Sequence, residues 1–302
     1  MRTPVVRLHV DAPAEIWLKL ENLQPVGAFK IRGAGNAVLS APREELAVGL
    51  VTTSTGNMAQ GVAWMARELG VPATIVVPDN ASASKLAAVE RLGGRIVRVP
   101  WEQWWAAVAA DEERDLGSDV RGFFVHPVQD PPVIAGNGTI GLELAEDLDE
   151  FDAVCIPWGG GGLATGIASA LRELRPKTKV YVCEPETGAP FAAALANGGI
   201  PVPVDFTPSF IDGAGSGSLL PTMWEHAKDL VANAFPIPLE EAAAGVRLLL
   251  ERGRIVGEGA AGLAVAAAVS GRAGTGRVVC IVSGGNIDPA RLAAILDGRV
   301  PD

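Results

Sequence analysis

The stretch that decides the fold is DAVCIPWGGGGLATGIASALRELR, residues 152–175. It begins with a short apolar run, continues through consecutive glycines, and ends in an alanine- and leucine-rich segment with helical spacing. This order predicts a buried strand over 152–157, a glycine turn, and a helix over 163–175. A strand that passes through a short turn into a helix is the repeating unit of α/β proteins.

The same alternation extends along the whole chain. Further strands are expected at residues 15–21, 49–54, 73–78, 95–100, 122–127, 179–184 and 277–283. Further helices are expected at residues 58–70, 84–94 and 239–253. Two Pro- and Gly-rich segments, 127–138 and 198–221, are expected to be ordered loops, and the second to border the substrate. Short β-branched strands that alternate with helices indicate parallel sheets, so the fold class is α/β.

The bulk composition predicts two lobes and excludes some partners. With 302 residues, of which 48% are hydrophobic and 20% charged, the chain can bury a large core. Acidic residues outnumber basic ones by 35 to 25, so attraction to a phosphate backbone is lacking and nucleic acid is not expected as a partner. No apolar run is long enough to cross a membrane and no signal peptide is recognisable, so we expect a cytoplasmic protein without membrane contact.

The cysteines and histidines indicate no metal site. Three cysteines lie in β-branched apolar runs, at Cys155, Cys183 and Cys280. A small buried side chain is the simplest explanation for each of them. The histidines have no spacing that would place two of them on one helix face as zinc ligands. Zinc chemistry is therefore not expected.

The segment KLENLQPVGAFKIRGAGNAV, residues 19–38, holds a group that can do covalent chemistry. Lys30 lies between Phe29 and Ile31, directly after a Gly27-Ala28 turn. Apolar surroundings disfavour an ammonium ion, and the neutral amine is the form that attacks a carbonyl carbon. A surface lysine whose stem lies along apolar residues at a helix start would account for the same pattern.

The glycine run 159–162 has the features of an anion-binding turn. Residues without a Cβ let backbone N–H groups converge on an anion, and the following helix adds the positive end of its dipole. The run lacks the Gly-Lys-Ser/Thr ending of nucleotide-binding loops and a clean GxGxxG pattern. A monophosphate is therefore favoured over a nucleotide, with a purely structural turn as the alternative.

Two further polar turns follow strands. The sequence STGNMAQG, residues 54–61, would place hydroxyls, an amide and N–H groups at a helix start, where they suit a carboxylate or only cap the helix. The sequence SGGN, residues 283–286, follows the last expected strand. Its serine can hydrogen-bond a ring nitrogen, although such a sequence is also typical of an ordinary turn.

Together and in this order, these segments resemble the fold-type II pyridoxal-phosphate family, the group of serine/threonine dehydratases and serine racemase. The likeness runs from Thr3-Pro4 through KLENLQPVGAFKIRGA, STGNMAQG, VHPVQDPPVIAGNGTIGLEL, PWGGGGLATGI, VYVCEP and GEGAAG to CIVSGGNID. It implies two doubly wound open parallel-sheet lobes with the cofactor in the cleft. The large lobe would comprise residues 1–48 and 128–302, and the small inserted lobe 49–127. It also implies a homo-oligomer, a dimer or tetramer, without a regulatory domain.

The resemblance assigns roles to individual residues. Lys30 would hold the cofactor as a Schiff base and remove the Cα proton, and Thr55 would be the second catalytic residue. Cofactor contacts are implied for Phe29, Lys30, Asn57, Gly159, Gly160, Gly161, Gly162, Leu163, Glu258, Ser283 and Gly284. Contacts to the substrate carboxylate are implied for Ser54, Thr55, Gly56, Asn57 and Met58. Ser283 would face the ring nitrogen, and its neutral hydroxyl favours elimination over transamination.

The sequence departs from the family pattern at three places. Met58 stands where the family usually has histidine, which replaces a polar contact near the substrate with an apolar side chain. The cation site of the family would use Glu184 and Gly188, but the position six residues after Glu184 is Pro190, which offers no ligand side chain. Trp158 is bulkier than the usual small residue before the glycines.

The implied activity is that of a pyridoxal-phosphate-dependent ammonia-lyase, which converts L-threonine, L-serine or a similar β-hydroxy amino acid to a 2-oxo acid and ammonia. One alternative is a serine racemase, because Thr55 stands where a base for the second face would lie. Others are a dehydratase of 3-hydroxyaspartate or of a β-aryl serine, and a non-catalytic metabolite-binding protein. We expect elimination to exceed racemisation and Met58 to favour a small or apolar β-substituent.

Overall fold

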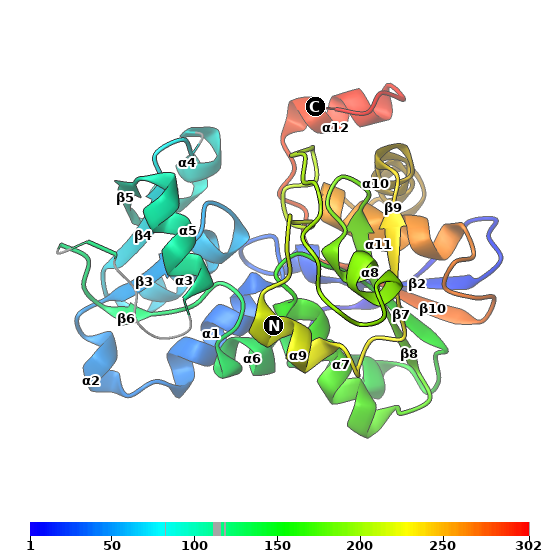
Figure 1. The fold of residues 1–302 in the computed structure, drawn as a ribbon, viewed down its shortest axis with the longest axis horizontal. Helices are drawn as coiled ribbons and strands as arrows, with labels where there is room; N and C mark the ends of the chain where they lie inside the picture. The colour runs from blue at the N-terminus through cyan, green and yellow to red at the C-terminus, as the bar shows by residue number, and fades with distance from the viewer. Residues whose placement is uncertain (82, 111–115, 118, 302) are drawn as a thin grey trace. The chain divides into compact units, whose positions relative to one another are not determined.

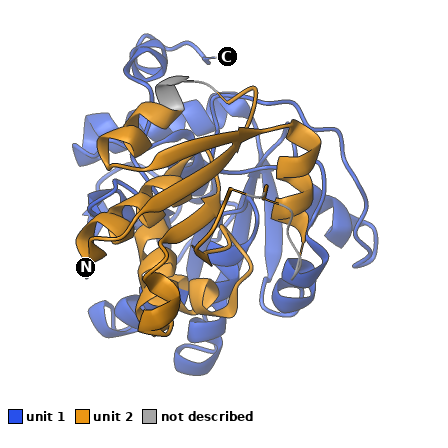
Figure 2. Ribbon diagram, turned by 90° about the vertical axis from the view of Figure 1, so that its left-hand side faces the viewer, with its two compact units in different colours: residues 1–29, 138–302 blue, residues 30–137 orange. Residues whose placement is uncertain are grey.

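The computed structural model describes residues 1–81, 83–110, 116–117 and 119–301. The chain divides into two compact units (Figure 2): unit 1 comprises residues 1–29 and 138–302, and unit 2 comprises residues 30–137. The expected small lobe, 49–127, falls inside unit 2. Unit 2 also contains α1 (Lys30–Ser40), because that helix packs against α3 (Asn57–Leu69) within the same unit.

Unit 1 is built on a six-stranded sheet (Figure 1). In spatial order its strands are β1 (Val5–Leu8), β2 (Glu15–Leu20), β10 (Arg277–Val282), β7 (Ala153–Pro157), β8 (Lys179–Pro185) and β9 (Asn233–Ile237). All neighbouring pairs are parallel except β1 with β2, which is antiparallel. Strands β1 and β9, which are the two edge strands, are not among the strands predicted from the sequence. Pro236 argues against a central strand but is tolerated at an edge, where the missing N–H breaks no inner ladder.

Helices cover both faces of this sheet. They are α7 (Gly162–Leu174), α8 (Pro190–Ala196), α9 (Pro221–Ala227), α10 (Leu239–Gly253), α11 (Gly259–Val269) and α12 (Pro289–Leu296). Along β10, Val278 and Val282 belong to the core that includes α10 and α11, whereas Val279 and Ile281 belong to the core that includes α7 to α9. Alternate side chains of one strand thus enter two cores, as expected for a doubly wound sheet.

Unit 2 contains a smaller, wholly parallel sheet. Its order is β5 (Arg95–Val99), β4 (Ala73–Pro78), β3 (Leu50–Thr53) and β6 (Phe123–Phe124). Its helices include α1, α2 (Arg43–Leu46), α3, α4 (Ala83–Arg91) and α5 (Trp101–Ala109). The expected α/β class with parallel sheets is therefore confirmed. No helix in the described part of the chain is long and apolar enough to span a membrane.

One expected loop is wrong, because α6 (Pro131–Asp147) occupies most of the segment 127–138. Prolines are tolerated in the first turn of a helix, where the N–H has no partner within the helix. The glycines that suggested a loop instead permit close packing: a Cβ on Gly136 would lie 2.3 Å from the backbone oxygen of Arg32. The other expected loop, 198–221, is confirmed, since no strand or helix occurs in it before α9 begins at Pro221.

Candidate active site

The glycine run and Ser283 lie at the same edge of the sheet in unit 1. Strands β7 and β10 are parallel neighbours, with Cys155 opposite Cys280. The glycines 159–162 follow the carboxyl end of β7, and Ser283 follows the carboxyl end of β10. In open parallel sheets, ligands bind beyond this edge. The two motifs are therefore placed side by side by the topology of one sheet.

The glycine loop cannot hold side chains at two of its positions. Gly161 is the N-cap of α7 and has a φ of +97°, and a Cβ there would lie 2.6 Å from the ring of Trp158. A Cβ on Gly159 would lie 2.8 Å from the backbone oxygen of Gly213, which belongs to the 198–221 loop. Leu163, in the first turn of α7, is 5% exposed and packs into the core. Backbone N–H groups at the start of a helix of 13 residues are a suitable site for a phosphate.

Ser283 has a buried hydroxyl at the end of β10. The residue is 2% exposed, and its Oγ has no hydrogen-bond partner among the residues that the structure describes. Its backbone oxygen accepts a hydrogen bond of 2.9 Å from the N–H of Phe29. A buried hydroxyl without a partner is costly, and at the carboxyl end of a parallel strand this hydroxyl is placed where a ligand can bind.

Gly284 and Glu258 adjoin this serine within unit 1. The N–H of Glu258, the N-cap residue of α11, donates to the backbone oxygen of Gly284 at 2.9 Å. A Cβ on Gly284 would lie 2.6 Å from Oε1 of Glu258, so the glutamate carboxylate packs directly against the glycine backbone. Gly284 also forms a bridge with Ala28, two residues before Lys30. Four of the predicted cofactor contacts, Phe29, Glu258, Ser283 and Gly284, are thus brought together.

Lys30 is the first residue of unit 2 and of α1. The residue is half-buried, and its Nζ donates a hydrogen bond of 2.6 Å to the backbone oxygen of Pro127. Helix α3 runs close beside it, since a Cβ on Gly61 would lie 3.5 Å from the backbone oxygen of Lys30. The amine is therefore tied by this hydrogen bond to the segment that follows β6 in the same unit.

The predicted carboxylate-binding residues lie between β3 and α3 in unit 2. Gly56 is the N-cap residue of α3 and has no side chain with which to cap the helix. The Oγ of Ser54 accepts a hydrogen bond of 3.2 Å from the N–H of Gly56. Thr55 and Asn57 are half-buried, whereas Met58 is 1% exposed. Polar atoms and the first N–H groups of α3 thus share one turn.

A family model described as pyridoxal-phosphate dependent enzyme matches residues 1–284. The chain belongs to this family. It is 40% identical over 287 residues to an L-threonine ammonia-lyase of Geobacter sulfurreducens, covering 93% of this chain and 70% of that protein. It is 35% identical to an L-threo-3-hydroxyaspartate ammonia-lyase of Saccharomyces cerevisiae, with 99% and 92% covered. The solved structure of maize serine racemase matches with a TM-score of 0.86 and 31% identity, covering 97% of this chain and 91% of that chain.

The residues of unit 1 fit pyridoxal phosphate, the cofactor of this family. The glycine loop provides backbone N–H groups and the positive end of the α7 dipole for a phosphate. Ser283 provides a buried hydroxyl whose Oγ has no partner within the described chain, at the neighbouring strand end. Such a hydroxyl can donate to a pyridine nitrogen. Both ends of the cofactor therefore have a complementary group at one sheet edge.

Glu184 and Gly188, the predicted cation ligands, also lie in unit 1. The carboxylate of Glu184 accepts hydrogen bonds from the N–H groups of Phe191 (3.0 Å) and Ala192 (2.9 Å) at the start of α8. Burial of this carboxyl raises its pKa to about 7. The backbone oxygen of Gly188 accepts from the N–H of Ser216. Among the described residues, no group of three or more His, Cys, Asp or Glu side chains is arranged to hold a metal ion. The cation site stays a prediction.

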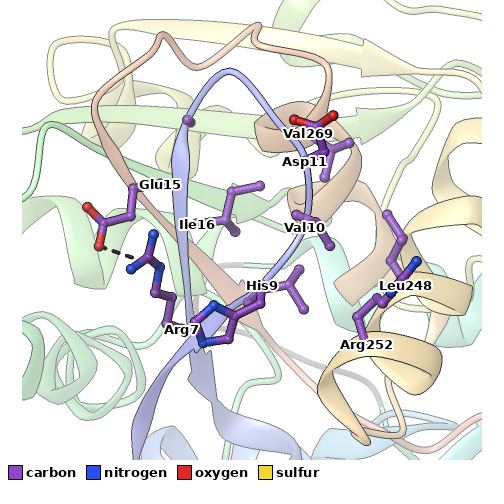
Figure 3. Close-up of a pocket in the computed structure, with 11 residues that line it drawn as sticks. Arg7, His9, Val10, Asp11, Glu15, Ile16, Leu248, Arg252 and Val269 are labelled. Atoms are coloured by element: carbon purple, nitrogen blue, oxygen red, sulfur yellow. Dashed lines mark ion pairs between the residues drawn. The ribbon is translucent and has the colours of Figure 1, made fainter.

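A separate hollow of about 620 Å³ lies at the opposite edge of the unit 1 sheet (Figure 3). It is lined by the β1–β2 connection and by α10, with Ile16 and Leu248 among its apolar residues and Arg252 at its margin. Arg7 and Glu15 form an ion pair of 3.7 Å beside it. Glu15 is the first residue of β2, so this hollow is at the amino ends of the parallel strands. It is not part of the predicted active site.

Pro127, whose backbone oxygen accepts from the Lys30 amine, is not among the site residues predicted from the sequence. These two residues are 97 positions apart, and the contact uses a backbone oxygen. No residue type marks a carbonyl acceptor. The only signal was the His-Pro pair within VHPVQDPP, which carried the family resemblance without a stated role.

Proposed function

We propose that this chain is a pyridoxal-phosphate-dependent ammonia-lyase that converts L-threonine, L-serine or a similar β-hydroxy amino acid to a 2-oxo acid and ammonia. The observation that carries the proposal is the uncharged hydroxyl of Ser283, buried at the end of β10. A carboxylate at this position would keep a pyridine nitrogen protonated and favour transamination, whereas a hydroxyl does not. The similarity to L-threonine ammonia-lyases supports the same reaction.

The proposed roles follow from the chemistry of each group. The bound cofactor withdraws electrons from the substrate Cα. Lys30 removes the Cα proton with its amine, which the backbone oxygen of Pro127 holds by a hydrogen bond. The remaining proposed cofactor contacts are Phe29, Asn57, Gly159, Gly160, Gly161, Gly162, Leu163, Glu258, Ser283 and Gly284. The large lobe, 1–48 and 128–302, would bind the cofactor phosphate, and the small lobe, 49–127, the substrate.

The substrate carboxylate is proposed to bind at the start of α3. The residues are Ser54, Thr55, Gly56, Asn57 and Met58. A helix N-terminus favours an anion through its N–H groups and its dipole. Because Met58 offers dispersion contacts but only a weak acceptor, a second carboxylate on the substrate would lack a partner. Threonine, serine or a β-aryl serine should therefore be better substrates than 3-hydroxyaspartate.

Racemisation is the second candidate activity, favoured by the similarity to maize serine racemase and by the position of Thr55. A racemase must deliver a proton to the face opposite Lys30. The β-branched side chain of Thr55 has restricted rotation about χ1, and its hydroxyl is a weak acid. Elimination needs only Lys30, the cofactor and a proton source for the leaving hydroxyl. Elimination should therefore outpace racemisation.

The test is a panel of β-hydroxy amino acids. Release of 2-oxo acid is measured for threonine, serine, a β-aryl serine and 3-hydroxyaspartate, with chiral chromatography of the remaining amino acid. Met58→His should narrow the disadvantage of 3-hydroxyaspartate, whereas Met58→Leu, which keeps the apolar character, should not. Enantiomer formation faster than 2-oxo acid release, or 3-hydroxyaspartate as the best substrate, would contradict the proposal.

The assembly, location and cation requirement are also proposals. We expect a cytoplasmic homo-oligomer, a dimer or tetramer, with light scattering after size-exclusion chromatography as the measurement. A cation at Glu184 and Gly188 would be detected by comparing activity after treatment with a chelator and after addition of Mg²⁺ or Ca²⁺. Both oxygens of Glu184 already accept backbone hydrogen bonds, so a bound cation would have to share them.

A further inference from the structure

His126 has a fully buried imidazole whose hydrogen bonds define its tautomer. Its Nδ1 accepts the backbone N–H groups of Val128 (3.0 Å) and Gln129 (2.9 Å). A backbone N–H can only donate, so Nδ1 carries no proton. Nε2 lies 2.9 Å from the backbone oxygen of Val108 in α5, which can only accept. These partners assign a neutral imidazole with its proton on Nε2.

The same hydrogen bonds fold residues 126–129 into a tight turn. Two consecutive N–H groups converge on one ring nitrogen, and the N–H of His126 donates to Oδ2 of Asp130 at 2.9 Å. The amide of Gln129 reaches the backbone oxygen of Ala110 at 3.3 Å, so the turn is also tied to the segment after α5. Pro127, whose φ is fixed by its ring, lies inside this turn. Its carbonyl oxygen is the acceptor for Nζ of Lys30, at 2.6 Å.

We propose that His126 is a positioning residue for Lys30. It acts through the Pro127 carbonyl, which it orients by accepting the two N–H groups that follow. A carbonyl oxygen can accept from either an amine or an ammonium group, so it directs Lys30 without taking its proton. This inference rests on the proposed function in one respect, namely that Lys30 is the residue that removes the substrate proton.

Three variants of His126 distinguish the contributions of the two ring nitrogens. His126→Asn keeps a polar oxygen near the position of Nδ1, His126→Gln places one near the position of Nε2, and His126→Phe keeps a ring without either nitrogen. Phe124→Leu is the matched control. The ring of Phe124 packs edge-on against the His126 ring, with 6.2 Å between the ring centroids, but Phe124 lies outside the turn. All variants are compared in the intact chain, with and without cofactor.

Two readouts do not depend on activity. Hydrogen exchange of the Val128 and Gln129 amides in the cofactor-free protein should be faster in His126→Phe and His126→Gln by about tenfold or more, and close to wild type in His126→Asn. Acylation of Lys30 by acetic anhydride, relative to the exposed Lys177, should increase in the same two variants. In the activity assay, kcat should fall by about tenfold or more in these variants while KM changes little.

The inference is overturned if His126→Phe retains the protection of both amides, or if His126→Asn is as impaired as His126→Phe. If His126→Phe does not fold, the comparison of amide exchange in His126→Asn and His126→Gln still tests the inference. A failure of the proposed function would look different: borohydride reduction would trap the cofactor on another lysine, while the amide exchange would still follow the predicted order. If the His126 variants show faster amide exchange and carry the cofactor on Lys30, but kcat is unchanged, the positioning role of His126 is refuted and the proposed function is not.

Discussion

Removal of the Ser283 hydroxyl should weaken cofactor binding without weakening the fold. The hydroxyl is buried and has no hydrogen-bond partner among the described residues. An unsatisfied buried polar group costs about 1–3 kcal/mol, so Ser283→Ala should leave the cofactor-free protein equally stable or more stable by about 1 kcal/mol. With cofactor bound, the variant lacks one hydrogen bond. The stabilisation that saturating cofactor gives should therefore fall by about 1–2 kcal/mol, which is about a 5- to 30-fold weaker affinity.

The assay is urea unfolding of wild type and variant, each with and without cofactor, together with titration of cofactor absorbance. The control is Thr52→Val, because Thr52 Oγ1 is likewise buried without a partner in the described chain but lies within β3, outside the proposed contacts. It should change the stability of both forms equally. The reasoning is refuted if Ser283→Ala binds cofactor as tightly as wild type, or if the cofactor-free variant loses more than about 1 kcal/mol.

Three further predictions concern unit 1. Gly161→Ala should weaken cofactor binding at least about tenfold in an absorbance titration, because its φ is +97° and the added Cβ would meet the Trp158 ring; unchanged affinity would contradict the loop geometry. Because the buried carboxyl of Glu184 has a pKa of about 7, folding takes up a proton between about pH 4.5 and 7. The free energy of unfolding should therefore fall by up to about 3 kcal/mol as pH rises through that window. Urea unfolding at a series of pH values should show this fall for wild type but not for Glu184→Gln. The same fall in Glu184→Gln would contradict the assignment to Glu184. Lys19→Met should reduce the free energy of unfolding by about 3–5 kcal/mol, because the fully buried Nζ lies 2.6 Å from Glu143; a loss below about 1 kcal/mol would show the pair to be dispensable.

The sequence predicted the parts of the fold whose signal is local. Strands such as β7, β8 and β10 are β-branched, buried on both faces and flanked by turns, so their pattern is independent of their neighbours. Strand β9 contains a proline, which is tolerated because the strand lies at the edge of the sheet. That edge position depends on the tertiary structure and cannot be read from the local sequence. Helix α6 looked like a loop because its glycines and prolines serve close packing and helix initiation, which local propensity counts against a helix.

The candidate site shows the same division. Lys30, the glycine run and the strand-end Ser283 could be selected from sequence because each belongs to a motif with a physical purpose. The contact between Lys30 and the Pro127 carbonyl could not be, since it joins distant segments through a backbone atom. The lack of a partner for Ser283 Oγ within the described residues likewise required coordinates, because it depends on every atom around the hydroxyl.

The most direct test of the account is to locate the covalent attachment of the cofactor. The holoenzyme is reduced with borohydride, digested, and its peptides are mapped by mass spectrometry. The account predicts that the reduced cofactor is found on Lys30, in the peptide that follows Gly27-Ala28-Phe29, and that Lys30→Ala carries none. Attachment to any other lysine, or full 2-oxo acid release by Lys30→Ala, would contradict it.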